Sequence, residues 1–493
     1  MTSDQENTPT PKPCDIDYAM SLSEKLEVAV RDIENDFYID DDFLIKASQY
    51  FEESMRAGLQ APEQDRAHMP MIPTYVTSLP TGKEKGLFLA ADLGGTNFRV
   101  CSVDLKGDHT FDLKQSKFRI PLDLMKGDHA DDLFRFLATK IAAFLDENHQ
   151  DCRVKGSKPL KLGFTFSFPV DQTALNRGTL LRWTKSFDIP DTVGRDVVQL
   201  LQANLTVLEV NVDVVALAND TVGTLLSRSY ANNPEYTHAN TVIGLIFGTG
   251  TNGAYYESFD RIPKLKNKPE GAKGMVINTE WGSFDNELKI LPNTLYDKIV
   301  DSETANKGYH MFEKRVSGLF LGEILRVALL DLFEKGLIFQ ELYKERGGSL
   351  PHRLITPWQL DSEVLSYIQI DDSTALKMSE LILQNTLRLP TTADERVVIQ
   401  RITRAISKRA AQLAAIPIAT IIRETKDLYA DDERDFEVGC DGSVIEFYPG
   451  FRDEIMKAFN VIDPLKGSRK KVHLKIAKDG SGVGAALIAA TTD

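Results

Sequence analysis

The sequence is poor in cysteine, with only four in 493 residues. They lie far apart, form no CxxC pair and have no histidine at zinc-binding spacing, which argues against a structural zinc site. The four are Cys14, Cys101, Cys152 and Cys440. We predict that they are reduced thiols in a cytoplasmic protein.

Basic residues are also fewer than acidic ones. The chain has 58 Lys and Arg residues against 72 Asp and Glu residues, which gives a formal net charge of −14. A protein this acidic has no general attraction to nucleic acid or to anionic membranes, so we expect neither as a partner. Any phosphate group that it binds must be held by local donors rather than by the charge of the whole molecule.

Long hydrophobic runs are missing as well. No uninterrupted apolar segment approaches the ~20 residues that span a bilayer. The start of the chain, MTSDQENTPTPKPCD, is polar and proline-rich and lacks the apolar core of a signal peptide. We predict that residues 1–14 form a disordered tail. The total length favours two domains, because one hydrophobic core rarely extends through so long a chain.

Short apolar segments alternate with helical patterns along the chain, which favours an α/β fold. The predicted strands cover 87–91, 98–105, 161–168, 212–217, 241–247, 254–256 and 275–277. The predicted helices cover 23–58, 133–145, 316–337, 375–387, 396–425 and 485–490. We also expect Asp191 to cap a helix that begins near residue 193.

Two parts of the chain follow the same plan: an apolar strand, a turn rich in Gly, Thr and Asn, and a second strand. The first turn is Asp92-Leu93-Gly94-Gly95-Thr96-Asn97, and the second is Gly248-Thr249-Gly250-Thr251-Asn252. Glycine lets backbone N–H groups approach phosphate oxygens, and Thr and Asn add side-chain donors. The repetition predicts two related domains that face each other. Each turn taken alone is also compatible with a plain β-hairpin.

Other phosphate-binding motifs are excluded by their context. The segment 248–253 matches GxGxxG, but a dinucleotide site needs a helix next, and Tyr255-Tyr256 predicts a strand. The HRD and DFG triplets of protein kinases are absent, as are the GK[ST] of a Walker loop and the HExxH of a zinc protease.

Polar residues follow several predicted strands, at the edge where open α/β sheets bind ligands. They are Ser167, Asn219, Asp220, Asn278 and Glu280, with Thr184 and Lys185 in a nearby loop. Together they offer the mixed donors and acceptors that a polyhydroxylated ligand needs. Taken singly, the Asn and Asp residues are typical of turns and helix caps, and Lys185 is typical of a solvated surface charge.

Nine segments in one order resemble motifs of the hexokinase family. They are LFLAADLGGTNFRV (87–100), LGFTFSFPV (162–170), RWTKSFDIPD (182–191), ALANDTVGTL (216–225), FGTGTNGAY (247–255), NTEWGSFDNE (278–287), FEKRVSGLFLGEILR (312–326), GCDGSV (439–444) and KDGSGVGAAL (478–487). The resemblance runs from about residue 20 to the C-terminus. The segments around Thr184 and Trp281 and the C-terminal segment are most similar to the fungal glucokinases of that family.

The resemblance implies an actin-like, ribonuclease H-like α/β fold with two domains and a central cleft. The small domain would cover 86–217 and 481–493, and the large domain 15–76 and 221–477. The implied activity is ATP-dependent phosphorylation of glucose at its 6-hydroxyl, the first step of glycolysis, with mannose and other hexoses as further candidates. Magnesium would arrive with ATP. The expected partners are glucose and ATP, and the expected state is a monomer or a weak homodimer.

By the same resemblance, Asp220 would be the general base and Lys185 would lie near the charge of the transferring phosphoryl group. The implied sugar-binding residues are Ser167, Thr184, Lys185, Asn219, Asp220, Asn252, Asn278, Glu280 and Glu313. The implied ATP-binding residues are Asp92, Gly94, Gly95, Thr96, Asn97 and Arg99 in a first phosphate segment, Gly248, Thr249 and Gly250 in a second, and Asp441, Gly442 and Ser443 in an adenosine segment. No carboxylate cage for a metal is implied, and Asp92 and Asp220 would meet magnesium through water.

Three other functions remain as alternatives. A general hexokinase would accept fructose as well, and the sugar-binding residues do not separate it from a glucokinase. A sugar sensor would bind hexose without transfer, but Asp220, Lys185, Thr96 and Thr249 are all present. An actin-like ATPase would not need the sugar-binding set.

Overall fold

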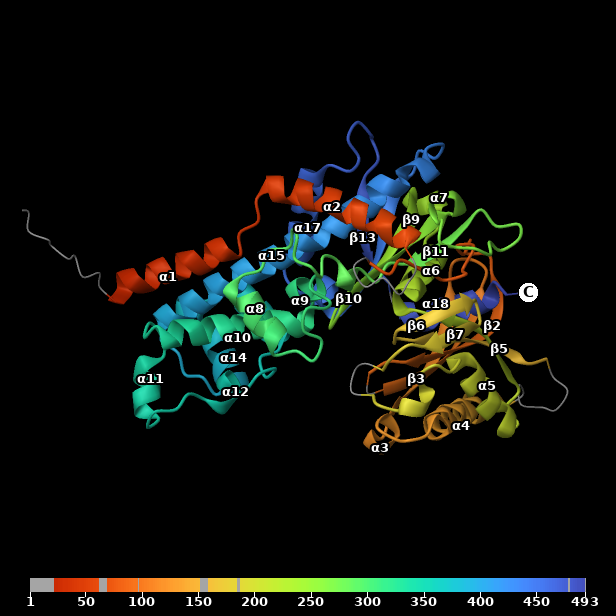
Figure 1. Cartoon of the computed structure of the whole chain (residues 1–493), viewed down its shortest axis with the longest axis horizontal. Coiled ribbons are helices and arrows are strands. Elements are labelled where there is room, and N and C mark those ends of the chain that lie inside the picture. Colours follow the sequence, from red (N-terminus) through yellow and green to blue (C-terminus); the bar gives the residue numbers. More distant parts are fainter. Residues whose placement is uncertain are drawn as a thin grey trace, which may run out of the picture.

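The computed structural model describes residues 22–61, 69–95, 97–150, 158–183, 187–477 and 479–492. The predicted tail at 1–14 lies outside these residues, and so do three predicted site residues, Thr96, Thr184 and Lys185. The described chain forms a small lobe on a five-stranded sheet, at the lower right of Figure 1, and a large lobe that joins a six-stranded sheet to an extended group of helices.

The sheet of the small lobe has the strand order β4-β3-β2-β5-β8. Strands β2, β3 and β4 form an antiparallel meander, and β5 and β8 continue the sheet parallel to β2. Helices α4 and α5 pack on one face through a hydrophobic cluster (Figure 1). The elements of this lobe are β2 (Lys85–Leu93), β3 (Asn97–Lys106), β4 (Phe111–Arg119), α3 (Leu122–Met125), α4 (Ala130–Asn148), β5 (Leu160–Phe166), β6 (Val170–Ala174), β7 (Arg177–Leu180), α5 (Val197–Val207) and β8 (Val212–Ala218).

The sheet of the large lobe has the order β1-β11-β10-β9-β12-β13. Strands β9, β10 and β11 form an antiparallel meander, and β12 and β13 run parallel to β9. Its strands are β1 (Ile72–Pro73), β9 (Ala239–Phe247), β10 (Thr251–Ser258), β11 (Gly274–Asn278), β12 (Asp435–Asp441) and β13 (Val472–Ile476). Apart from the edge strand β1, the order and directions match those of the small lobe. The two strand-turn-strand units of the sequence are the equivalent hairpins β2–β3 and β9–β10.

Helices α6 (Asp220–Ala231) and α18 (Gly480–Ala490) lie between the two sheets. The hydrophobic cluster around them takes Ala90 and Ala216 from the small lobe and Ala254 and Val276 from the large lobe. The two helices touch at glycines, because a Cβ on Gly484 would overlap the backbone of Gly223. The helix predicted at 485–490 begins earlier, at Gly480, and Gly484 within it permits this close packing.

The remaining helices belong to the large lobe. They are α1 (Leu22–Asp36), α2 (Asp41–Gln60), α7 (Pro234–Thr237), α8 (Leu295–Ser302), α9 (Glu313–Val316), α10 (Gly318–Glu334), α11 (Gln340–Glu345), α12 (His352–Ile355), α13 (Ser362–Ile370), α14 (Lys377–Leu387), α15 (Ala393–Thr425), α16 (Ser443–Phe447) and α17 (Phe451–Ile462). The segment 393–429 around α15 is long and apolar enough to span a membrane, but 83% of its most apolar stretch is buried in the molecule. This burial is typical of a core helix.

Several helix predictions were wrong in detail. The helix predicted at 316–337 is divided at Ser317, whose extended backbone (φ −92°, ψ 154°) separates α9 from α10, and α10 ends at Glu334. The segment 23–58 is not one helix, because Asp40 starts α2 by accepting a hydrogen bond from the backbone N–H of Phe43 at 2.7 Å. Asp191 does not cap α5; Asp196 does, through the N–H groups of residues 198 and 199. Asp191 instead accepts from the N–H of Ala130, the first residue of α4, at 2.6 Å, although the two residues are 61 positions apart in the sequence.

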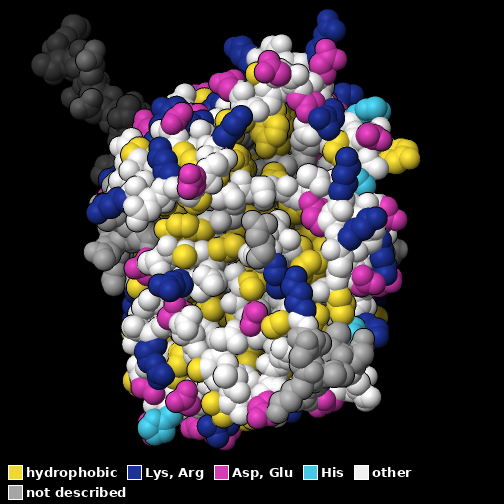
Figure 2. Space-filling model, turned by 90° about the vertical axis from the view of Figure 1, so that its right-hand side faces the viewer, with side chains coloured by type: hydrophobic (Ala, Val, Ile, Leu, Met, Phe, Trp, Pro, Cys, Tyr) yellow, Lys and Arg dark blue, Asp and Glu magenta, His cyan; other side chains and the backbone are white. Residues whose placement is uncertain are grey.

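The surface at the right of Figure 1 carries charges of both signs. Figure 2 shows Lys and Arg side chains interspersed there with Asp and Glu, and hydrophobic side chains visible between them. The net charge of −14 is therefore not gathered into one acidic area on this face.

Candidate active site

The first glycine turn joins β2 to β3 and lines a polar pocket. The pocket is formed by Asp92, Gly94, Gly95, Asn97 and Arg99, together with Lys117 of β4. Lys117 lies directly opposite Arg99 in the β3–β4 ladder, so two cations flank the turn. Nothing in the sequence around Lys117 marks it as a site residue, because only the pairing of β3 with β4 brings it to the turn.

The C-terminal helix begins beside this pocket. The hydroxyl of Ser481 donates to Asp92 Oδ2 at 3.1 Å. Arg99 Nη1 lies 3.9 Å from Asp479 Oδ1. Ser167 is close by, since its N–H donates to the carbonyl of Leu93 at the end of β2. The start of α18 therefore holds the carboxylate of the first turn.

The second glycine turn joins β9 to β10 and contacts the predicted adenosine segment. Gly442 has a φ of +106°, and a Cβ there would lie 2.5 Å from the carbonyl of Phe247 and 2.7 Å from Gly248 N. Only glycine fits this approach. The N–H of Gly318, at the start of α10, donates to the carbonyl of Gly248 at 2.7 Å. Thr249, at the tip of the turn, is exposed.

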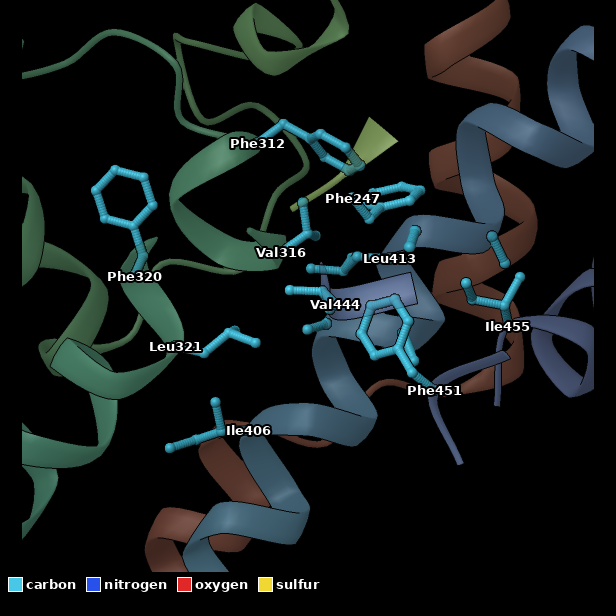
Figure 3. Close-up of a cluster of buried hydrophobic side chains, with 14 of the residues drawn as sticks. Phe247, Phe312, Val316, Phe320, Leu321, Ile406, Leu413, Val444, Phe451 and Ile455 are labelled. Carbon is cyan, nitrogen blue, oxygen red and sulfur yellow. The ribbon is translucent and has the colours of Figure 1, made fainter. Parts of the chain in front are cut away.

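A shared hydrophobic core anchors these segments. Phe247 precedes the second turn, Val444 follows Ser443, and Val316 ends the short helix that starts at Glu313. Figure 3 shows the three side chains in one cluster with Phe451 and Leu413. Each site segment is thus fixed by a buried neighbour one to three residues away in the sequence.

Two amides and a carboxylate form a hydrogen-bonded group at the ends of β10 and β11. Asn252 Nδ2 donates to Asn278 Oδ1 at 2.8 Å and to Glu280 Oε1 at 2.9 Å. Asn278 Nδ2 donates to the same Glu280 oxygen at 2.8 Å. Burial raises the pKa of Glu280, although the bond from Asn278 opposes the rise. The three predicted sugar-binding residues are therefore brought together.

Glu313 lies next to this group. Its Oε2 accepts from the N–H of Thr251 at 3.0 Å, and its Oε1 lies 3.3 Å from His310 Nδ1. Trp281 Nε1 donates to the hydroxyl of Thr251 at 2.9 Å, which fixes the strand that carries Asn252. Nothing in the local sequence marks His310, whereas Thr251 belongs to the second Gly/Thr/Asn turn, and its contact with Glu313 arises only in the folded chain.

Asn219 and Asp220 stand where β8 passes into α6. Asn219 is the N-cap, and its Oδ1 accepts from the N–H of Thr221 at 2.9 Å. Asn219 thus acts as a helix cap, as is typical of an Asn at the end of a strand. Asp220 is the first residue of the helix and is half-buried.

The charge of Asp220 acts on two other site carboxylates. Burial raises the pKa of Asp441, and the charge of Asp220 adds to the rise. The charge of Asp220 also adds to the rise at Glu280. Asp220 therefore lies within electrostatic reach of both the sugar-binding candidates and the adenosine candidates.

Glu280→Gln is expected to raise the KM for glucose roughly 10- to 100-fold, because a hydrogen bond to a charged group contributes about 1.5–3 kcal/mol. It should also remove a pH dependence of stability. The pKa of Glu280 is raised in the folded state. The protonated side chain therefore stabilises the fold fully below its ordinary pKa, and this stabilisation is lost as pH rises through the raised value. Kinetics and unfolding midpoints between about pH 4 and pH 8 check both effects.

The exposed Glu270 supplies the matched control. Glu270→Gln should leave the glucose KM and the pH dependence of the unfolding midpoint as in wild type. A Glu280→Gln variant with the wild-type KM would show that this carboxylate does not hold the sugar.

Among residues 22–492 as far as the structure describes them, no group of three or more His, Cys, Asp or Glu side chains is placed to hold a metal ion. The described carboxylates of the site are dispersed over both lobes.

Sequence comparison decides the family. Two models of the hexokinase family match residues 29–230 and 242–491. The chain belongs to the hexokinase family. It is 52% identical to Glucokinase-1 of Saccharomyces cerevisiae over 484 residues, which covers 94% of this chain and 96% of that one. It is 41% identical to Hexokinase-2 of the same yeast, with 95% and 93% covered.

A solved structure agrees. The hexokinase from Schistosoma mansoni complexed with glucose is 36% identical, with a TM-score of 0.81, 96% of this chain covered and 100% of that one. The predicted hexokinase-type, two-domain α/β fold is confirmed.

Proposed function

We propose that this hexokinase-family chain is a glucokinase, which transfers the γ-phosphoryl group of ATP to the 6-hydroxyl of glucose. The observation that carries the proposal is the position of Asp220. Asp220 begins α6, and the hydroxyl of Thr224 donates to its carbonyl at 3.0 Å. A Cβ on Gly480 would lie 2.9 Å from Thr224 Oγ1 and 3.4 Å from Asp441 Oδ2, so the first turn of α6 and Asp441 both lie close to Gly480. The charge of Asp220 also adds to the raised pKa of Asp441 and of Glu280. A proton acceptor between a sugar-binding group and a phosphate-binding group is what this reaction requires.

The sugar side has the chemistry for a polyhydroxylated ligand. Glu280 and Glu313 supply acceptors, and Asn219, Asn252 and Asn278 supply both donors and acceptors. All except Asn278 are half-buried, so their side chains remain partly accessible. The Schistosoma relative complexed with glucose supports the same ligand for this chain.

In the transfer step, Asp220 accepts the proton of the 6-hydroxyl as the sugar oxygen bonds to the γ-phosphorus. The bond from that phosphorus to the bridging oxygen breaks, and ADP leaves. Positioning and charge stabilisation carry most of the catalysis of phosphoryl transfer. Lys185, outside the described residues, is the proposed cation near the transferring group.

The residues around the first turn fit a magnesium–ATP complex. The pocket contains one carboxylate, Asp92, and two cations, Arg99 and Lys117. Gly95 has open space around the position of a Cβ, so its backbone can be approached closely. Bound magnesium supplies charge neutralisation at the phosphate oxygens and keeps several waters, through which Asp92 and Asp220 would hold it.

Several wider properties belong to the same proposal. We propose a small domain of 86–217 with 481–493, and a large domain of 15–76 with 221–477, that close on the sugar and exclude water. The matching strand orders of the two sheets support this division. We also propose a cytoplasmic monomer or weak homodimer, which the buried free thiols of Cys101 and Cys440 are compatible with.

A coupled ADP-release assay with glucose, mannose, fructose or no sugar, at saturating magnesium–ATP, tests the function. We expect sugar-dependent turnover with glucose far ahead of fructose. Equal rates with glucose and fructose would make the chain a general hexokinase. Sugar binding without turnover would leave a sensor, and ATP turnover without sugar would indicate an ATPase.

A further inference from the structure

Arg182 of the small lobe contacts Tyr309 of the large lobe. The guanidinium carbon of Arg182 lies 5.4 Å from the centroid of the Tyr309 ring. Arg182 follows β7, whereas Tyr309 lies in the segment between α8 and α9. A guanidinium within about 6 Å of an aromatic centroid is attracted to the ring face. The pair therefore joins the two lobes beside the candidate site.

The segment that carries Arg182 is packed through its neighbour Trp183. The next residue, Trp183, donates its Nε1 hydrogen to the carbonyl of Ile189 at 2.9 Å. Its ring stacks on Phe187 at 5.1 Å and meets the edge of Phe168 at 4.9 Å. Phe168 directly follows Ser167, a predicted sugar-binding residue. The segment that carries Arg182 is therefore packed against a residue next to the predicted sugar-binding Ser167.

Hydrogen bonds of Asp301 and Lys314 anchor the segment that precedes Tyr309. The carboxylate of Asp301 accepts from the N–H of Gly308 at 3.0 Å and from Lys314 Nζ at 2.6 Å. Lys314 also donates to the carbonyl of Asn306 at 2.8 Å, and its side chain is buried. The segment before Tyr309 is thus tied to the helix that starts at Glu313.

From Tyr309 the contacts continue to a sugar-binding carboxylate. The rings of Tyr309 and His310 meet edge to face at 4.5 Å. His310 Nδ1 is buried and lies 3.3 Å from Glu313 Oε1, a close contact without hydrogen-bond geometry. His310 has a φ of +58°, in the left-handed region that residues other than glycine adopt infrequently.

We propose that Arg182, Tyr309 and His310 are positioning residues that couple the approach of the small lobe to sugar binding. Arg182 on Tyr309 fixes the ring, the ring packs against His310, and the imidazole of His310 packs against the carboxylate of Glu313. The inference rests on the proposed function for the identity of the ligand. Since none of the three residues touches the reacting atoms, their contribution is to the affinity for sugar and not to the transfer step.

Arg182→Gln, Tyr309→Leu and the double variant test the coupling. Each single variant is expected to weaken glucose binding about 2- to 5-fold, the range for a cation–π contact at a partly exposed site. The double variant should be no weaker than the single ones, because both remove the same contact. Tyr309→Phe keeps the ring and should bind as wild type. The KM for ATP and kcat should stay within 2-fold of wild type, because these residues do not touch the reacting atoms.

The third residue is tested in a His310→Ala background, where Arg182→Gln should have no further effect on glucose binding. Additive losses in the double variant, an equal rise in the KM for ATP, or an undiminished Arg182→Gln effect without His310 would overturn the coupling. Calorimetry with glucose alone measures binding without turnover, so it separates the two proposals. Glucose binding that follows the expected pattern without phosphorylation would overturn only the proposed function. A wild type that does not bind glucose would overturn both.

Discussion

Asp220→Asn is expected to lower kcat for glucose phosphorylation roughly 10²- to 10⁴-fold, the usual contribution of a positioned general base. Asparagine keeps the side-chain oxygen that accepts the N–H of Thr221 at 3.0 Å, so the start of α6 should be preserved. It cannot take the proton of the 6-hydroxyl. The dissociation constant for glucose should therefore change little. The coupled ADP-release assay gives kcat, and calorimetry gives the affinity.

Asp213→Asn is the matched control, because Asp213 is an exposed carboxylate of β8, the strand that leads to Asp220. This variant should keep the wild-type kcat and glucose affinity. If Asp220→Asn retained wild-type kcat, another group would have to accept the proton. If it lost glucose binding as completely as turnover, the role of Asp220 would be in binding rather than in proton transfer.

Gly484→Ala is expected to lower the free energy of unfolding by at least about 1–3 kcal/mol, the usual effect of forcing extra atoms into a packed interior. The added Cβ would overlap the Cα, carbonyl carbon and oxygen of Gly223, and backbone atoms cannot turn aside as a side chain can. Activity should fall with stability, since the displaced helix α6 begins at Asp220. Thermal unfolding, with the assay at a temperature where the variant is folded, measures both.

Gly482→Ala in the same helix is the control. Its Cβ would meet Cys101 Sγ at 3.2 Å, a side-chain atom that can shift. Alanine also improves helix propensity by about 1 kcal/mol over glycine. The midpoint of unfolding should therefore stay close to that of wild type. Equal midpoints for the two variants would mean that the contact between α6 and α18 does not limit the stability of the fold.

Local patterns in the sequence were enough to predict the strands around both glycine turns. Leu93 and Phe98 are fully buried on either side of the first turn, and Phe247 is fully buried before the second. Apolar runs bounded by glycine identify such strands, because a buried strand and its turn are properties of adjacent residues. The order of the nine family-like segments likewise identified the family and its fold.

Helix ends were harder to predict, since a cap is defined by what its side chain reaches. Asp191 has the residue type of an N-cap, but its carboxylate accepts from the first N–H of α4, whose own N-cap position is His129. The pattern of residues 23–58 predicts one helix, but α1 ends at Asp36 and α2 begins at Asp41, after the capping bond of Asp40.

The sequence by itself determined the two Gly/Thr/Asn hairpins, the polar residues at the strand ends and the family. Only the tertiary structure decided that Lys117 faces the first turn, that His310 lies against Glu313, and that Gly223 meets Gly484. The physical reason is the separation in sequence of the residues that interact. Strand, turn and apolar periodicity arise from neighbours in the chain, whereas these three contacts arise where separate strands pair, segments fold back and helices cross.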